Sequence, residues 1–241
     1  MKNANSKTQQ FSTWQWLLLS STPFLLSLIH HITINPLVKR LGLPHYFASF
    51  INFGILFELG FVIYLGLKLT GKFTLIGAVR YRELLPWWWY PLGFVVFLVI
   101  MFSITGAMVP VSRFLRVTIF TEMSASFGRF DASPFTEPVL NLMVFGVLIV
   151  MPFSAVIEEL YFRGILLPRM EHLGWWGPLI SAVFWAITHI GEPWDIPAWI
   201  LIFLPLIFFT KWKKNVYMIT FINGMFNLLN AIGLAETTFG G

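Results

Sequence analysis

Apolar residues follow one another along this chain in long runs, and short polar segments separate the runs. The runs have the length of helices and lack the alternation, over about ten residues, of a membrane β-barrel strand. The pattern therefore predicts an all-α fold: a polytopic transmembrane helix bundle of about seven spans, with six to eight possible. The predicted helices cover residues 14–29, 46–69, 87–111, 139 to just before Pro168, 178–190, 196–209 and 216–234.

The composition supports a membrane protein and excludes a water-soluble domain. Only 11% of the residues are charged, whereas soluble domains carry about 25%. The 26 Phe and 11 Trp residues are too apolar for a disordered chain. A chain with no Cys forms no disulfide and has no thiolate nucleophile. The net charge of +5 comes from basic residues in the short polar segments, so we expect a lipid bilayer and no nucleic acid as partner.

The distribution of Lys and Arg between alternate loops predicts the orientation of the chain. With seven spans, eleven basic residues lie on the side of the N-terminus and five on the opposite side. Cytoplasmic loops carry the excess of Lys and Arg. We therefore expect an integral protein of the cell (inner) membrane with a cytoplasmic N-terminus.

The longest stretch without a predicted span is the amphipathic loop 112–138, which is the best candidate for a surface helix or a lid. It divides the chain into N-terminal transmembrane helices (1–137), a core (138–231) and a short C-terminal tail (232–241).

A few charged residues interrupt the apolar runs and are functional candidates, because a charge inside a bilayer costs about 2.5–3.5 kcal/mol on insertion scales. Glu158 and Glu159 directly follow the apolar run 139–157. Glu159 and Arg163 are four residues apart and share a helix face, so they are expected to pair. Glu158 points about 100° away and remains free for chemistry. Glu58 lies alone in mid-helix, as a substrate-binding residue or as the counter-ion of a buried cation.

Two later helices carry polar residues at helical spacing. Ser181, Trp185 and His189 are expected to share one polar and aromatic face. Each feature also has a purely structural explanation, since Glu pairs at helix ends are often solvated, a single His is often interfacial, and Asn often joins helices. Their combination and order favour a function. The polar stripe of the last helix, expected to face the protein interior, consists of Thr220, Asn223, Asn227 and Asn230.

This combination resembles the CPBP family of membrane proteins, the CAAX-protease and bacteriocin-processing family also called Abi. The resemblance runs from roughly residue 138 to 231. The family has three motifs: EExxxR, a Phe four residues before a His, and a His four residues before an Asn. In this chain the motif positions are Glu158, Glu159 and Arg163, then Trp185 and His189, then Asn223 and Asn227.

The resemblance implies a glutamate-dependent intramembrane endopeptidase whose catalytic residues occupy the three motifs. In that family the first Glu activates a water molecule, the motif-two His assists, and the motif-three pair stabilises the oxyanion. Trp185, in the place of Phe, is expected to contact the substrate. Asn223 departs from the family's His. If that His only donates a hydrogen bond, an amide N–H can substitute; if it must be charged or bind a metal, the site is weakened.

We expect no cofactor and a hydrophobic or membrane-associated peptide or protein as substrate. A divalent metal at Glu158 and His189 is an alternative with few possible ligands. Two other functions stay open. One is a non-catalytic membrane protein on the same scaffold, such as an immunity or assembly factor. The other is a proton-coupled transporter, although no pair of broken helices repeats in the two halves of the chain.

Overall fold

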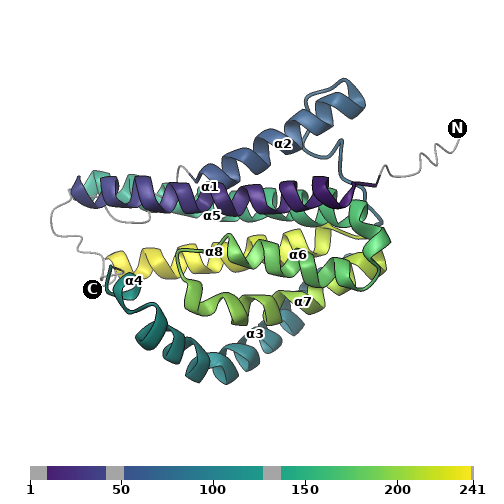
Figure 1. Ribbon diagram of the computed structural model, residues 1–241. Helices are drawn as coiled ribbons and strands as arrows, with labels where there is room; N and C mark the ends of the chain where they lie inside the picture. The colour runs from purple at the N-terminus through teal and green to yellow at the C-terminus, as the bar shows by residue number, and fades with distance from the viewer. Residues whose placement is uncertain (1–9, 42–51, 127–136, 240–241) are drawn as a thin grey trace, which may run out of the picture.

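The computed structural model describes residues 10–41, 52–126 and 137–239 and confirms the all-helical fold (Figure 1). Short π-helical and 3-10 segments extend or join the α-helices. The α-helices are α1 (Thr13–Arg40), α2 (Phe53–Thr70), α3 (Trp89–Phe114), α4 (Thr121–Ser126), α5 (Glu137–Glu159), α6 (Trp176–Ile187), α7 (Ile196–Lys213) and α8 (Tyr217–Phe239). The π-helical segments are Leu115–Ile119 and Leu160–Leu166, and the 3-10 segments are Leu167–Leu173 and Pro193–Asp195.

The chain is a polytopic helical membrane protein. Each predicted helix has a counterpart in the structure, and five helical segments of the described residues are long and apolar enough to cross a membrane. The shorter apolar helix α6 has 12 residues. The five candidate spans are Thr13–Val38, Phe53–Thr70, Trp89–Ile119, Leu140–Leu173 and Pro193–Lys213.

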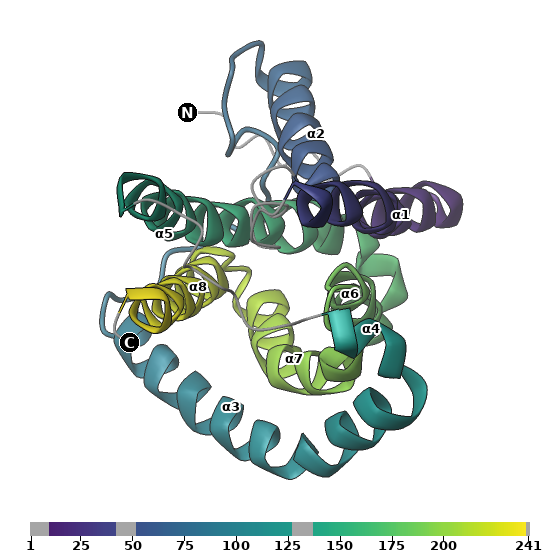
Figure 2. The ribbon, with the colours of Figure 1, turned by 90° about the vertical axis from the view of Figure 1, so that its left-hand side faces the viewer.

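The core forms where α5, α6, α7 and α8 meet. α5 packs along α8, and α6 packs against α7, while α3 bows around the outer side of α7 and α8 and α2 leans away from the bundle (Figure 2). Aromatic rings fill the interior: Phe203 lies 4.4 Å from Trp185 and 5.4 Å from Phe97 between ring centroids. Such edge-to-face and tilted contacts add to the stabilisation from burial.

The helix that carries Glu158 continues much further than predicted. Its predicted end before Pro168 is wrong, because the helical path runs on through π-helical and 3-10 turns to Leu173. Pro168 lies in the first turn of the 3-10 segment, where a missing N–H breaks no helical hydrogen bond. Glu158 therefore lies near the middle of the 34-residue segment Leu140–Leu173.

Other boundaries also differ from the prediction. The amphipathic loop expected from residue 112 begins later, because α3 continues as a π-helical segment to Ile119 and α4 follows. Residues 127–136 of that predicted loop lie outside the described residues. The first helix, expected to end at residue 29, extends to Arg40. His189, expected inside a helix, follows α6 by two residues, since α6 ends at Ile187.

The connection between α2 and α3 closes one end of the bundle. The N–H of Arg80 donates to the carbonyl of Gly164 (3.0 Å), and the N–H of Val216 donates to the carbonyl of Tyr81 (2.8 Å). Burial and the neighbouring Glu171 carboxylate raise the pKa of Tyr81 well above its ordinary value. We call this the basic end, because it holds the charged ends of several helices and connections. Its basic residues include Lys68, Lys72, Arg80, Arg82, Lys211, Lys213 and Lys214.

The predicted orientation can be tested with single Cys variants, because the chain has no Cys of its own. Lys72 follows α2 at the basic end, and Arg113 lies in the last turn of α3 at the opposite end. We expect a membrane-impermeant maleimide to label Arg113→Cys in intact cells and Lys72→Cys only after permeabilisation. The reverse pattern would show that the basic end faces outward.

Candidate functional site

The EExxxR residues lie where α5 opens into the wider turns of a π-helix. Glu159 ends α5, and the π-helical segment Leu160–Leu166 follows, with every residue buried. Gly164 permits this packing, since a Cβ there would lie 3.2 Å from both methyl groups of Val79. Single turns of π-helix occur mostly at functional sites, because they rotate neighbouring side chains out of α-helical register.

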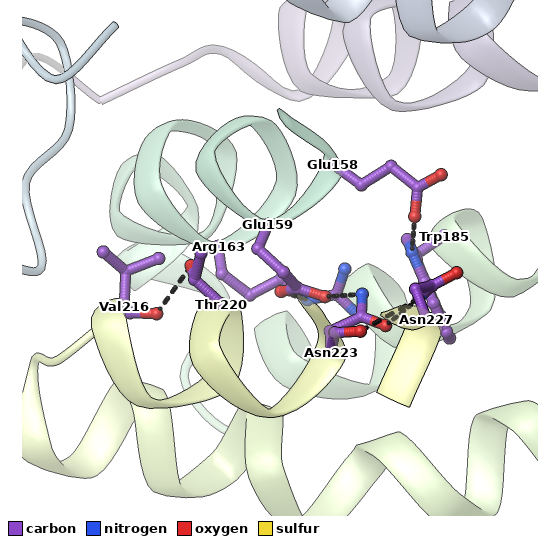
Figure 3. Close-up of polar contacts among 8 residues, drawn as sticks. All are labelled: Glu158, Glu159, Arg163, Trp185, Val216, Thr220, Asn223 and Asn227. Carbon is purple, nitrogen blue, oxygen red and sulfur yellow. Dashed lines mark hydrogen bonds and ion pairs between the residues drawn. The ribbon is translucent and has the colours of Figure 1, made fainter. Parts of the chain in front are cut away.

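Glu159 and Arg163 form the buried ion pair that the spacing predicts. Arg163 Nε lies 3.3 Å from Glu159 Oε2, and both side chains are 0% exposed. Asn223 of α8 donates from Nδ2 to Glu159 Oε1 at 2.9 Å. Asn227 in turn donates to Asn223 Oδ1 at 2.9 Å. The first and third motifs thus form one hydrogen-bonded cluster between α5 and α8 (Figure 3).

Glu158 points away from this cluster and towards α6 (Figure 3). Its Oε2 accepts a hydrogen bond of 2.9 Å from Trp185 Nε1. The guanidinium carbon of Arg163 lies 4.8 Å from the centre of the Trp185 ring. Trp185, which is only 2% exposed, therefore links the two carboxylates of the motif. It donates a hydrogen bond to Glu158, and its ring lies against Arg163, which is paired with Glu159. Glu158 remains partly exposed, whereas Glu159 is sealed.

His189 packs against the other side of Trp185. The two ring centroids lie 4.7 Å apart, and His189 Nδ1 lies 3.3 Å from the carbonyl of Trp185. Nδ1 therefore faces the backbone, which leaves Nε2 as the nitrogen available to a ligand. Among the described residues, no hydrogen bond joins Glu158 directly to His189 or Asn227. Trp185 contacts both Glu158 and His189.

Only part of the polar stripe of α8 takes part in the hydrogen-bonded cluster. The hydroxyl of Thr220 donates to the carbonyl of Val216 in its own helix at 2.9 Å, and Asn230 is exposed. The expectation that the whole stripe faces the interior is therefore wrong for Asn230. Helical spacing defines one face of a helix, but it does not tell how far a neighbouring helix covers that face.

Glu58 of α2 approaches the same cluster from another side. Its side chain is 1% exposed, and it lies within electrostatic range of Glu158, Glu159 and Arg163. The buried cation nearby, Arg163, forms its ion pair with Glu159 among the described residues, so the structure does not show Glu58 as its counter-ion. A contact with substrate, the other alternative, would require Glu58 to become exposed.

Two buried polar residues near the site were not among the candidates. Arg169 is 4% exposed and donates to the carbonyl of Ile165 at 2.7 Å. Tyr161 is fully buried, and its hydroxyl donates to the carbonyl of Leu19 at 2.7 Å. Tyr161 lies inside the EExxxR motif itself, so its polar group in a buried helix was a usable signal. No comparable signal marks Arg169, which has the position of a loop charge in the sequence.

The alternative of a metal at Glu158 and His189 gains no support from the donor atoms. The part of the chain that the structure describes contains no group of three or more His, Cys, Asp or Glu residues placed to hold a metal ion. Metal sites in proteins need at least three such ligands as a rule. One oxygen of Glu158 is moreover engaged by the indole of Trp185.

The fold and the site together define an integral membrane protein of the polytopic helical class, with carboxylates, a guanidinium, amides and an imidazole gathered between its helices. Residues 140–229 match the model of the Rce1-like family, described as type II CAAX prenyl endopeptidase Rce1-like. This segment is a domain of that family within the CPBP (Abi) group, which confirms the resemblance seen in the sequence. No curated protein and no solved structure matches the chain.

The ion pair can be tested by removing its members singly and together. Arg163→Met leaves a buried carboxylate without its counter-ion, so we expect a loss of about 3–5 kcal/mol in the free energy of unfolding. Glu159→Gln combined with Arg163→Met removes both charges and keeps an acceptor for Asn223. Thermal unfolding of the purified protein in detergent should therefore show the double variant to be more stable than Arg163→Met. A double variant less stable than Arg163→Met would contradict the pairing.

Proposed function

We propose that the protein is an intramembrane endopeptidase that hydrolyses a peptide bond of a hydrophobic or membrane-associated peptide or protein. The family domain at residues 140–229 supports a peptidase. The observation that carries the proposal further is the difference between the two adjacent carboxylates. Glu159 is sealed and paired with Arg163, while Glu158 is partly exposed and keeps one oxygen free of the hydrogen bond from Trp185.

In the proposed mechanism, the carboxylate of Glu158 takes a proton from a water molecule while the water oxygen attacks the carbonyl carbon of the peptide bond. The resulting tetrahedral oxyanion accepts a hydrogen bond from an amide of α8, and Nε2 of His189 assists the proton transfer. The C–N bond then breaks as Glu158 returns the proton to the leaving nitrogen. Proton transfer by a positioned side chain contributes about 10²–10⁴-fold to such a reaction.

The surrounding residues hold these groups in position. The indole N–H of Trp185 orients the Glu158 carboxylate, and the ring of Trp185 supports His189. Asn223 uses one amide N–H for Glu159, so its second N–H is held in a defined direction and can serve the oxyanion. An uncharged amide suffices for this role, because oxyanion holes are built from neutral donors in many enzymes.

A non-catalytic role on the same scaffold is the second candidate, and Asn223 is the observation that favours it. Its amide both donates to Glu159 and accepts from Asn227. These hydrogen bonds link α5 to α8. A cluster that only joined the two helices would have the same contacts. This candidate predicts that the cell tolerates loss of the Glu158 carboxylate.

The two candidates can be separated with Glu158→Gln, which keeps the shape and the acceptor for Trp185 but removes the base. The measurement compares the N-terminal peptides of membrane proteins in cells that produce the wild type, Glu158→Gln, or the matched control Glu122→Gln. Glu122 is an exposed residue of α4. We expect new N-termini with the wild type and the control, and at least a 100-fold loss with Glu158→Gln, on the order of a missing general base.

Equal amounts of each variant in the membrane fraction are the condition for this comparison. If all three proteins give the same N-terminal peptides at equal amounts, the protein is not an endopeptidase and the scaffold role gains support.

A further inference from the structure

Glu58 is a buried carboxylate that the family motifs do not include. It lies on α2, outside the matched residues 140–229. Its side chain is 1% exposed, and its Oε2 has no hydrogen-bond partner among the described residues. α2 packs against α5 and the π-helical segment that follows it, so Glu58 faces the EExxxR motif from the side opposite α8.

The charges around Glu58 do not balance. Glu58, Glu158 and Glu159 lie within electrostatic range of one another and of a single guanidinium, that of Arg163. With all three carboxylates ionised, the cluster would carry two uncompensated negative charges in a surrounding of low dielectric constant. Like charges in such a place are not ionised together, because sharing a proton removes their repulsion.

Among the described residues, the charged groups that act on Glu58 are Glu158, Glu159 and Arg163, and the other elements packed against α2 bring polar groups near it. From the π-helical segment comes Tyr161, whose hydroxyl already donates to the carbonyl of Leu19 at 2.7 Å. α1 contributes His30 and His31. The ring of His30 lies edge-on to Phe53, with 5.3 Å between ring centroids, and His31 Nδ1 is within 2.6 Å of Asn35 Nδ2.

The hydrogen bonds distinguish which carboxylate holds the proton. Glu159 has Arg163 and the amide of Asn223, both of which stabilise its ionised form. Glu158 has the indole N–H of Trp185. Glu58 has neither a donor nor a close cation on its Oε2, so its ionised form is the least stabilised of the three.

We propose that Glu58 is a positioning residue of the site, and that it is the carboxyl group of this cluster that carries a proton. When Glu58 is neutral, Arg163 stays paired with Glu159. Glu158 then has one negative charge fewer in its surroundings. Once ionised, Glu58 competes with Glu159 for Arg163 and disturbs the cluster that holds Asn223. The consequence for catalysis rests on the proposed function, but the protonation of Glu58 does not.

Infrared spectroscopy tests the protonation directly on the purified full-length protein. A protonated carboxyl has a C=O stretching band that is separate from the two bands of a carboxylate. We expect the difference spectrum of the wild type minus Glu58→Gln at neutral pH to contain the protonated C=O band, shifted in D₂O. The matched difference for Glu122→Gln, at an exposed position, should contain carboxylate bands alone. Carboxylate bands in the Glu58 difference would overturn the proposal.

Should Glu58→Gln fail to fold, as judged by circular dichroism, Glu58→Asp serves the same comparison. It keeps an acid at the position and is expected to shift the protonated C=O band instead of removing it. A protonated band that is the same in Glu58→Asp and the wild type would assign the proton to another residue and overturn the proposal.

The pH profile of cleavage tests the positioning role. The substrate peptide is one whose new N-terminus depends on Glu158. We expect the wild-type rate to fall at alkaline pH as Glu58 ionises, and this limb of the profile to be lost in Glu58→Gln. If the profile of Glu58→Gln superimposes on that of the wild type, Glu58 has only a packing role. If no variant cleaves any peptide, the endopeptidase proposal fails, while the infrared result still decides where the proton is.

Discussion

The buried guanidinium of Arg163 is the constraint around which the helices of the core are arranged. A charge that is 0% exposed costs several kcal/mol unless the fold surrounds it with compensating groups. Those groups come from distant parts of the chain: Glu159 from the preceding turn, Asn223 through Glu159 from α8, and the Trp185 ring from α6. Compensation of one charge thus links three helices.

The two adjacent glutamates of one sequence motif have different surroundings, because successive residues of α5 point about 100° apart. Glu159 lies inside the cluster, and Glu158 lies partly exposed beside α6. The difference is environmental, since the two side chains are the same. One is sealed with a cation and an amide. The other accepts a single indole N–H and can reach water or a substrate. In the proposed mechanism, the sealed carboxylate is the structural member of the pair and the partly exposed one is the base.

Trp185 and Asn223 are the two positions at which the site departs from the family motifs. An indole has an N–H that the phenyl ring of Phe lacks, and here this N–H holds Glu158 in place. Its large ring also lies beside His189 and under Arg163. The motif-two departure therefore supplies a hydrogen bond where the motif-three departure, Asn223, removes an imidazole. The two positions are linked through the Glu159 and Arg163 pair that lies between them.

The sequence by itself determined the class of protein, the all-helical fold, the Glu159–Arg163 pair and the family resemblance of residues 138–231, because hydrophobic runs, i, i+4 spacing and motifs are local properties of the chain. Helix ends were less predictable. The helix was expected to end before Pro168, yet helical turns continue among buried residues to Leu173. Only the tertiary structure decided that Trp185 contacts both Glu158 and His189 and that Glu58 is buried within electrostatic range of Arg163. Those contacts join residues on different helices. Their formation depends on how the helices pack, which a local sequence pattern does not predict.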